Sequence, residues 1–270
     1  MKAFFNHLSF DFRTGIRNKN LLLMNYLLPL GFYLMMGLVM AGLNPYFLPV
    51  MIPAMVIFAI LSGTLLGLPD PLVKAREDGI FRSFKINGVP AFSILVIPAM
   101  TTLLHLIITA MIISVTAPLF FKAPLPTDWL NFILISLLTA FTCSGLGVLI
   151  GVISASSRIT VIWSQMIYLP SMLLGGMMVP YDLLPDTPAK ISRLLPATHA
   201  MNAFRGMAFG LEADFNAVLS VVILLTSGLL AFGLATYLFN WDSLNRSRRG
   251  RPLLSAIVTL PYIAGLLWLR

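Results

Sequence analysis

Charged residues are spaced unevenly along the chain, and six long stretches contain none of them. They are 20–69, 86–121, 129–157, 159–181, 215–241 and 252–269. A helix needs about 20 residues to cross a hydrocarbon core of about 30 Å. The first stretch is long enough for two crossings, and each of the next four for about one. The pattern predicts an all-α integral membrane protein.

The first stretch is interrupted at Asn44–Pro45, with Pro49 close behind, so it divides into two spans. The six predicted spans lie near 20–42, 49–69, 91–119, 129–153, 160–180 and 216–240. Composition agrees, because 58% of residues are hydrophobic and only 10% are charged. Ordinary globular domains carry roughly 25% charged residues. The spans define a transmembrane domain over 20–240.

The distribution of Lys and Arg residues predicts which side of the membrane each connection faces. Of the 18 in the chain, 13 lie in the N-terminal segment and in the connections near 70–90, 158 and 241–252. The connections on the other side carry four, and the side richer in positive charge is normally cytoplasmic. We therefore expect a cytoplasmic N-terminus and a basic cytoplasmic linker at 241–252. The net charge of +8 has this simpler explanation and does not indicate nucleic-acid binding.

The two ends of the chain are predicted to meet the membrane differently. Segment 253–270 is a possible seventh span, since 253–269 is apolar but is short and contains Pro261. It either crosses, which we favour, or lies in the interface. Segment 1–19 suits a helix lying flat at the headgroups. Its apolar residues share an arc of about 120° at 100° per residue; they are Phe4, Phe5, Leu8, Phe12 and Ile16. Asn6, Arg13 and Arg17 point away, and a solvated lead-in is the alternative.

The predicted spans contain no Asp, Glu, Lys or Arg. Ion-coupled carriers usually need an ionisable group near the midplane. Besides Cys143 and tyrosines, the spans contain only His105, which we interpret as bonding a neighbouring helix. Ion-driven transport is disfavoured, although backbone carbonyls can also bind sodium. The single cysteine excludes an intramolecular disulfide.

Enzyme chemistry finds little support. The histidines are scattered and form no H-E-x-x-H zinc pair, so no metal site is predicted. Ser144–Gly145 could hold a nucleophile, but span 6 has no histidine to act as its base. A membrane enzyme acting on lipid or peptide bonds through Ser144 or His199 is the alternative function. Gly147-x-x-x-Gly151 and Gly63-x-x-x-Gly67 are better interpreted as helix-packing patterns.

No lysine follows a glycine, so the phosphate-binding loop G-x-x-x-x-G-K-[ST] cannot occur. The chain is not expected to hydrolyse ATP by that route. Any work it performs must draw energy from a partner.

The cytoplasmic connection 70–90 predicts a short amphipathic helix. Gly79 and the Gly88–Pro90 pair bracket its residues, 80–87. Its apolar residues, Ile80, Phe81 and Phe84, share one face of the helix. Its basic residues, Arg82 and Lys85, point away from that face. Such a helix suits docking into a partner's groove with a basic rim, or resting on lipid headgroups. The residues alone leave these alternatives equal.

The outer segment 175–214 is too apolar for a free loop. Four prolines divide it into pieces that begin helices well: Pro180, Pro185, Pro188 and Pro196. We expect one or two short helices that dip back into the outer leaflet, with Arg205 reaching headgroups or the protein interior. A simple solvent loop is the alternative.

The connection 70–90 and the outer segment both resemble motifs of one family. The connection is similar to its cytoplasmic Arg-Glu-x-Gly…Pro pattern, at Arg76, Glu77, Gly79 and Pro90. The outer segment is similar to its signature after span 5, at Gly176, Pro180, Leu184-Pro185, Leu195-Pro196 and Arg205. Residues 1–240 therefore resemble the type-2 ABC transporter permease family. Two departures are Ile80, where the family often has Thr, and the additional segment 253–269.

The resemblance implies the membrane subunit of an ATP-driven exporter in the bacterial plasma (inner) membrane. It would pair with a second permease, usually as a dimer, and with two cytosolic ABC ATPase subunits. Helix 80–88 would be the coupling helix that receives movement from the ATPase. The chain would bind no cofactor itself, with ATP and Mg on the partner subunits. The substrate is not implied.

Overall fold

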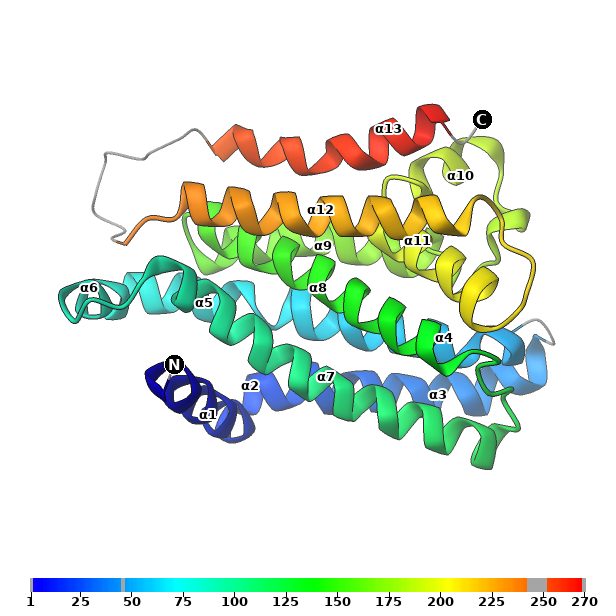
Figure 1. The fold of residues 1–270 in the computed structure, drawn as a ribbon. Coiled ribbons are helices and arrows are strands. Elements are labelled where there is room, and N and C mark those ends of the chain that lie inside the picture. Colours follow the sequence, from blue (N-terminus) through cyan, green and yellow to red (C-terminus); the bar gives the residue numbers. More distant parts are fainter. Residues whose placement is uncertain (1, 45–46, 242–251, 269–270) are drawn as a thin grey trace.

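The structure, a computed structural model, describes residues 2–44, 47–241 and 252–268, with side chains from Leu8 onward. Its elements in this part of the chain are all helical. Long helices lie side by side along one axis, and short helices lie at the two ends of this bundle (Figure 1). The predicted all-α class is confirmed for the described residues.

In the described part of the chain, five helical segments are long and apolar enough to cross a membrane. Three are single helices: α7 (Ala91–Phe121), α8 (Trp129–Ile153) and α12 (Ala217–Leu238). The segment Lys19–Leu43 comprises α2 (Lys19–Leu22), the π-helical η1 (Leu23–Leu27) and α3 (Leu28–Leu43). The segment Leu48–Glu77 comprises the 3₁₀ turn η2 (Leu48–Val50), α4 (Met51–Leu61), the π-helical η3 (Ser62–Leu66) and α5 (Pro69–Glu77). Five predicted spans thus have their expected helices.

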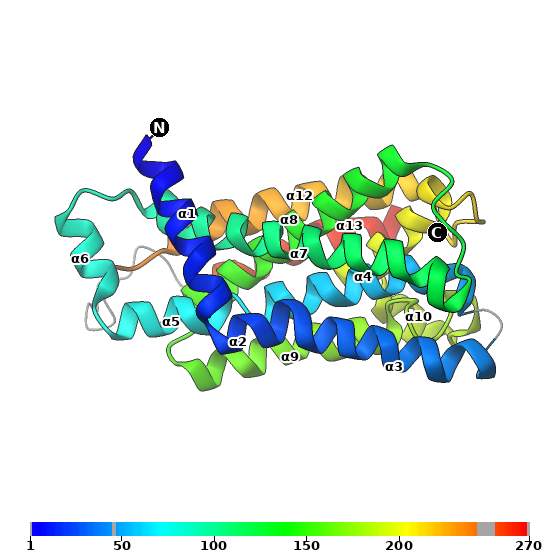
Figure 2. The ribbon, with the colours of Figure 1, turned by 90° about the horizontal axis from the view of Figure 1, so that it is seen from below.

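The remaining predicted span corresponds to α9 (Ser157–Leu174). It is 18 residues long and runs beside the others in both ribbon views (Figure 1, Figure 2). It is less apolar than the five, because it contains Arg158 and Gln165.

Short elements gather at opposite ends of the bundle. One end holds α1 (Lys2–Arg17) and α6 (Ile80–Ile86); α1 lies crosswise to the long helices (Figure 2). The other end holds η4 (Tyr181–Leu183), α10 (Asp186–Ser192), α11 (Pro196–Ala203) and the π-helical η5 (Phe204–Ala208). The connections predicted to be cytoplasmic and those predicted to be outside therefore lie at opposite ends of the bundle.

The second span forms the centre of the bundle. Every residue of α4 is buried, whereas α3 and α7 expose large apolar side chains such as Leu38 (76% exposed) and Leu119 (73%). Exposed apolar side chains on outer helices suit a hydrocarbon surround, since lipid tails are as apolar as leucine. The bundle therefore has a protein-packed axis and a lipid-facing surface.

Glycines let α8 approach this central helix. A Cβ on Gly147 would lie under 3.0 Å from the carbonyl oxygen of Thr64, closer than real Cβ contacts come. A Cβ on Gly151 would press against Leu72 and the carbonyl oxygen of Pro69. The glycine pattern in span 4 therefore packs against η3 and α5 of the second span, which confirms the packing interpretation of Gly147-x-x-x-Gly151.

The C-terminal apolar segment lies against α12. It consists of the 3₁₀ helix η6 (Pro252–Thr259) and α13 (Leu260–Trp268), and it runs antiparallel to α12 (Figure 1). A 3₁₀ helix rises about 2.0 Å per residue and an α-helix 1.5 Å, so the two together extend about 30 Å. Residues 242–251, most of the predicted basic linker, lie outside the described residues.

A glycine substitution tests the close approach of α8. We expect Gly147→Ala to lower stability by about 1–3 kcal/mol, because the new methyl group must displace backbone. Gly233→Ala is the matched control, since a Cβ there meets nothing within 4 Å and alanine favours helix. Thermal unfolding midpoints in detergent measure both. Equal midpoints for the two variants would contradict the packing.

Candidate functional site

The predicted cytoplasmic motif forms a helical arm. Helix α5 continues the second span, the chain turns at Asp78–Gly79, and α6 follows. Gly79 has φ 75° and Gly88 has φ 72°. Such left-handed conformations favour glycine because it has no Cβ. The two glycines therefore set the boundaries of α6, within a residue of those predicted.

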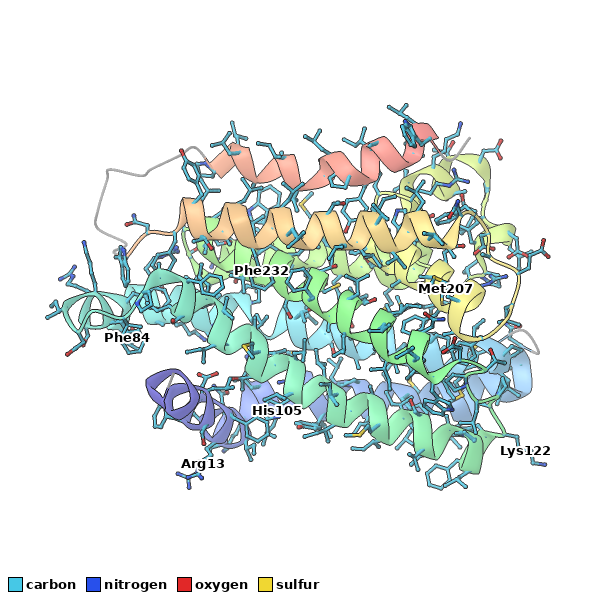
Figure 3. All side chains as sticks on the ribbon, in the orientation of Figure 1. Arg13, Phe84, His105, Lys122, Met207 and Phe232 are labelled. Carbon is cyan, nitrogen blue, oxygen red and sulfur yellow. The ribbon has the colours of Figure 1, made fainter. Side chains whose placement is uncertain are left out.

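The orientation of α6 differs from the prediction. Phe81 is buried (4% exposed), and its ring packs 5.4 Å from that of Phe239. Phe84 is half-buried and lines, with Phe81, a cavity of about 290 Å³ that faces α1 and α7. The expectation that this aromatic face is presented to a partner is wrong, because α6 uses it to pack on its own bundle. Figure 3 labels Phe84 at this end of the molecule.

The outer surface of α6 is mainly polar. Its exposed residues are Ile80, Arg82, Ser83, Lys85 and Ile86. Ile86 is the most exposed apolar residue among them, at 81%. This end of the arm therefore presents basic residues together with two exposed aliphatic side chains, of which Ile86 protrudes furthest and Ile80 is 43% exposed. Glu77, Gly88 and Pro90 of the predicted motif lie beside α6; Glu77 and Pro90 are exposed.

Arg76 joins the arm to the fourth span. Its Nη1 donates to the carbonyl oxygen of Val152 at 2.9 Å, and its Nη2 donates to that of Ser154. These carbonyls are at the C-terminal end of α8, where helix carbonyls lack partners and the helix dipole favours a cation. Arg76 is only 8% exposed. The sequence motif contained this arginine, but sequence could not identify its partner 76 residues away.

The two π-helical turns η1 and η3 contact each other. The hydroxyl of Ser62 in η3 donates to the carbonyl oxygen of Met24 in η1 at 2.9 Å. The hydroxyl of Thr109 in α7 donates to the carbonyl oxygen of Asn25 at 2.7 Å. Carbonyls in π-turns miss their usual helical partners, and π-turns recur at functional sites. Spans 1, 2 and 3 are therefore tied together where the second span widens.

His105 forms a contact between helices, as predicted. Its Nδ1 lies 2.7 Å from the Tyr26 hydroxyl, and its ring stacks on Phe12 of α1 at 4.4 Å between centroids. The flat N-terminal helix therefore packs Phe12 on α7, and not into lipid as expected. Arg13 is exposed on the other side (Figure 3). Phe4, Phe5 and Asn6 precede the described side chains.

The outer segment folds into short helices, so the free-loop alternative is wrong. Pro185 immediately precedes α10, and Pro196 is the first residue of α11. All of α11 is buried, as is Leu195. Gly176 has φ 78°, which explains the glycine of the motif. Pro180 and Leu184 are half-buried next to η4.

Asn202 and His199 hold this segment to the start of α12. The amide of Asn202 exchanges hydrogen bonds with the backbone of Phe215, at 2.8 and 3.1 Å. His199 contacts the Arg193 carbonyl through Nε2 at 2.8 Å and the Ser220 hydroxyl through Nδ1 at 3.3 Å. Sequence reasoning missed Asn202. Its spacing of three from His199 places both on one helix face, and that was the available signal.

Arg205 points into a charged cavity at this end. It pairs with Asp214 at 3.3 Å and donates through Nε to the Glu212 carbonyl at 3.2 Å. The cavity is about 400 Å³ and is also lined by Gly176 and Asp182. Burial raises the pKa of the Asp214 carboxyl, and the Arg205 charge opposes that shift. Arg205 is thus held by protein groups.

Among the described residues, Ser144 and His199, the two candidates of the enzyme alternative, do not form a catalytic pair. Both ring nitrogens of His199 are already in hydrogen bonds. Ser144 is buried, and its hydroxyl has no hydrogen-bond partner among the described residues. Within the same residues, no group of three His, Cys, Asp or Glu side chains could hold a metal ion.

A known protein family matches most of this chain. The family model of the ABC-2 type transporter matches residues 3–209, more than half of the chain. The chain belongs to the ABC-2 type transporter family. The match includes α6 and α11 and extends through Arg205. This ABC-2 permease is therefore a multi-pass transporter membrane component, and ATPase subunits are the kind of partner its family uses. No curated protein and no solved structure matches it.

Replacing Arg76 should loosen the arm of this permease. We expect Arg76→Gln to destabilise the contact between α5 and α8 by about 2 kcal/mol, because charged hydrogen bonds are lost. Faster hydrogen exchange at 152–156 would report it. Arg158→Gln removes an exposed charge on the next helix and is the control. Equal exchange in both variants would show that Arg76 does not hold the helices together.

Proposed function

We propose that this ABC-2 permease is the membrane subunit of an ATP-driven exporter and receives movement from cytosolic ATPase subunits through α6. The observation that carries the proposal is the continuity of the arm with the core. Helix α6 follows directly from α5, which continues the central, fully buried α4. Displacement of α6 therefore acts on the middle of the bundle.

Two contacts support transmission through this arm. The aromatic inner face of α6 packs on Phe239 after α12, and Arg76 bonds the end of α8. Both are side-chain contacts in packed surroundings, and such interfaces respond to force by shifting as units. Movement of α6 would carry the adjoining ends of spans 2, 4 and 6 together.

The docking surface is the exposed side of α6. Ile86 would enter an apolar pocket of the ATPase, and Arg82 and Lys85 would lie at its rim. Burying one large aliphatic side chain inside a polar rim is a common arrangement at interfaces. The alternative, a helix resting on headgroups, would use the same residues without any ATPase.

Further partners follow from the same proposal. A second permease copy would complete the translocation pathway, and ATP with Mg would bind the ATPase subunits. The chain contains no G-x-x-x-x-G-K-[ST] loop for that purpose. The apolar outer surface would contact bilayer lipid directly.

The proposed topology has six spans, with α9 as the fifth, and a seventh formed by η6 and α13. The end that carries α1 and α6 would be cytoplasmic, because most Lys and Arg residues lie in the connections there. The membrane would be the bacterial plasma membrane. The antiparallel alignment of η6 and α13 with α12 supports crossing over lying flat, and their combined length of about 30 Å is enough to cross.

Fusion reporters test this topology. We expect alkaline phosphatase fused after Arg270 to be active, because the seventh span would carry it outside. The same enzyme fused after Asn240 should be inactive, since it would remain in the cytoplasm. Inactivity of both fusions, with stable protein present, would place segment 253–269 in the interface.

Substitution of the exposed aliphatic residue tests docking. We expect Ile86→Asp to weaken co-purification with the cognate ATPase by at least about tenfold, since a carboxylate would enter an apolar pocket. ATP-driven transport in proteoliposomes should fall with it.

Leu125→Asp is the matched control, because Leu125 is also an exposed aliphatic residue of the same size but lies between α7 and α8 at the opposite end. This variant should retain both the ATPase and transport. Normal association and transport by Ile86→Asp would refute docking through α6.

A further inference from the structure

An apolar cavity lies between α4, α7 and α8, away from both motifs. Its volume is about 300 Å³. Val56 of α4, Ala110 and Ser114 of α7, and Phe132 and Ala140 of α8 are among its lining residues. The motifs of the permease do not account for it, because all of its lining lies within three spans.

The cavity belongs to the half of the bundle opposite α6. Ser114 precedes the end of α7 at Phe121 by seven residues, which is about 10 Å of helix. Trp129, the first residue of α8, also lines the cavity. Tryptophan at a helix end is typical of the membrane–water interface. In the proposed topology the cavity therefore lies in the outer leaflet, beginning just below the headgroups.

Some of the side chains around the cavity lie on the outer surface of the bundle. Met111 and Val115 of α7 are 55% and 62% exposed, and Ile133 of α8 is 50% exposed. All three are lining residues that also contribute to the outer surface of two helices able to span a membrane. The medium at this surface is hydrocarbon, and apolar cavities of this kind stay dry. A hydrocarbon chain can therefore enter from the side.

Ser114 is one of two serines in this largely apolar lining, the other being Ser136. Ser114 is 4% exposed, and its hydroxyl has no hydrogen-bond partner among the described residues. Other hydroxyls nearby are satisfied by the backbone: Thr116 donates to the Ile112 carbonyl at 2.7 Å, and Ser136 to the Phe132 carbonyl at 2.7 Å. A buried hydroxyl without a partner is costly. A ligand with an acceptor atom beside its chain would remove that cost.

We propose that this cavity is a lipid site that binds one acyl chain, with the Ser114 hydroxyl donating to the carbonyl oxygen at the head of the chain. The shared chemistry is an aliphatic chain that ends in an ester or carboxyl group. It is supplied either by a bilayer phospholipid or by a free fatty acid. The site is separate from the proposed ATP coupling, and binding requires no ATPase.

Photolabelling tests the site directly. The permease is reconstituted with phosphatidylethanolamine carrying a diazirine in one acyl chain, or in a second arm with diazirine-labelled palmitic acid. It is then transferred to detergent, irradiated and mapped by peptide mass spectrometry. We expect retained label on 103–115 and 129–140, and little on the lipid-facing residues of α12. Label from the first probe identifies a resident phospholipid, and label from the second a free amphiphile; either supports the site.

Variants separate the cavity from the general surface. Ala110→Phe fills the cavity and should remove at least about nine-tenths of the retained label, and Leu137→Trp fills it from α8 if the first variant does not fold. Ser114→Ala should reduce retention about three- to tenfold, the value of one hydrogen bond. Leu119→Phe adds bulk on the same helix outside the cavity and should have no effect.

Three outcomes would overturn the proposal. Equal label on α12 and on the cavity would show ordinary lipid contact. Unchanged label in both filled variants would place the chain elsewhere. Cross-links between Met111 and a second permease copy, with no lipid label, would show that protein covers this face.

Discussion

The bundle depends on the direct contact between the backbones of α8 and the second span. Gly147 lies against the carbonyl of Thr64, and no larger residue fits there without displacing backbone. In a membrane, helices associate through van der Waals packing and hydrogen bonds, because hydrocarbon gives no hydrophobic drive between them. The same pair of helices is joined again at its end by Arg76. Spans 2 and 4 therefore form one unit, around which the other helices pack.

Much of this fold follows from the sequence for a physical reason. Charge is expensive in hydrocarbon, so the uncharged stretches predicted the spanning helices. Glycine and proline favour particular backbone φ angles, so Gly79, Pro185 and Pro196 predicted where α6, α10 and α11 begin. What the apolar face of an amphipathic helix packs against could not be predicted in this way. The spacing of Phe81 and Phe84 specifies a shared face, but an apolar face suits a partner, lipid or the protein itself equally well. Phe239, more than 150 positions along the chain, decided between them.

Contacts within the bundle were harder to predict. The π-turn at Leu23–Leu27 accepts hydrogen bonds from hydroxyls of two other helical segments, those of Ser62 and Thr109. The local sequence of the turn contains no sign of those partners. Likewise, His105 could be assigned to a helix contact, but its stacking on Phe12 required knowing where α1 lies. At the other end of the bundle, Asn202 lies in a largely apolar segment. Its amide hydrogen-bonds the backbone carbonyl and N–H of Phe215, just before α12.

The 3₁₀ form of Pro252–Thr259 has a consequence for the fit between this protein and its membrane. Each residue that changes from 3₁₀ to α geometry shortens the segment by about 0.5 Å, so complete conversion would remove about 4 Å. Membranes of different composition vary in thickness by a few ångströms. In the proposed seven-span topology, rewinding of this segment would match it to thin or thick bilayers, while α12 beside it would keep its length.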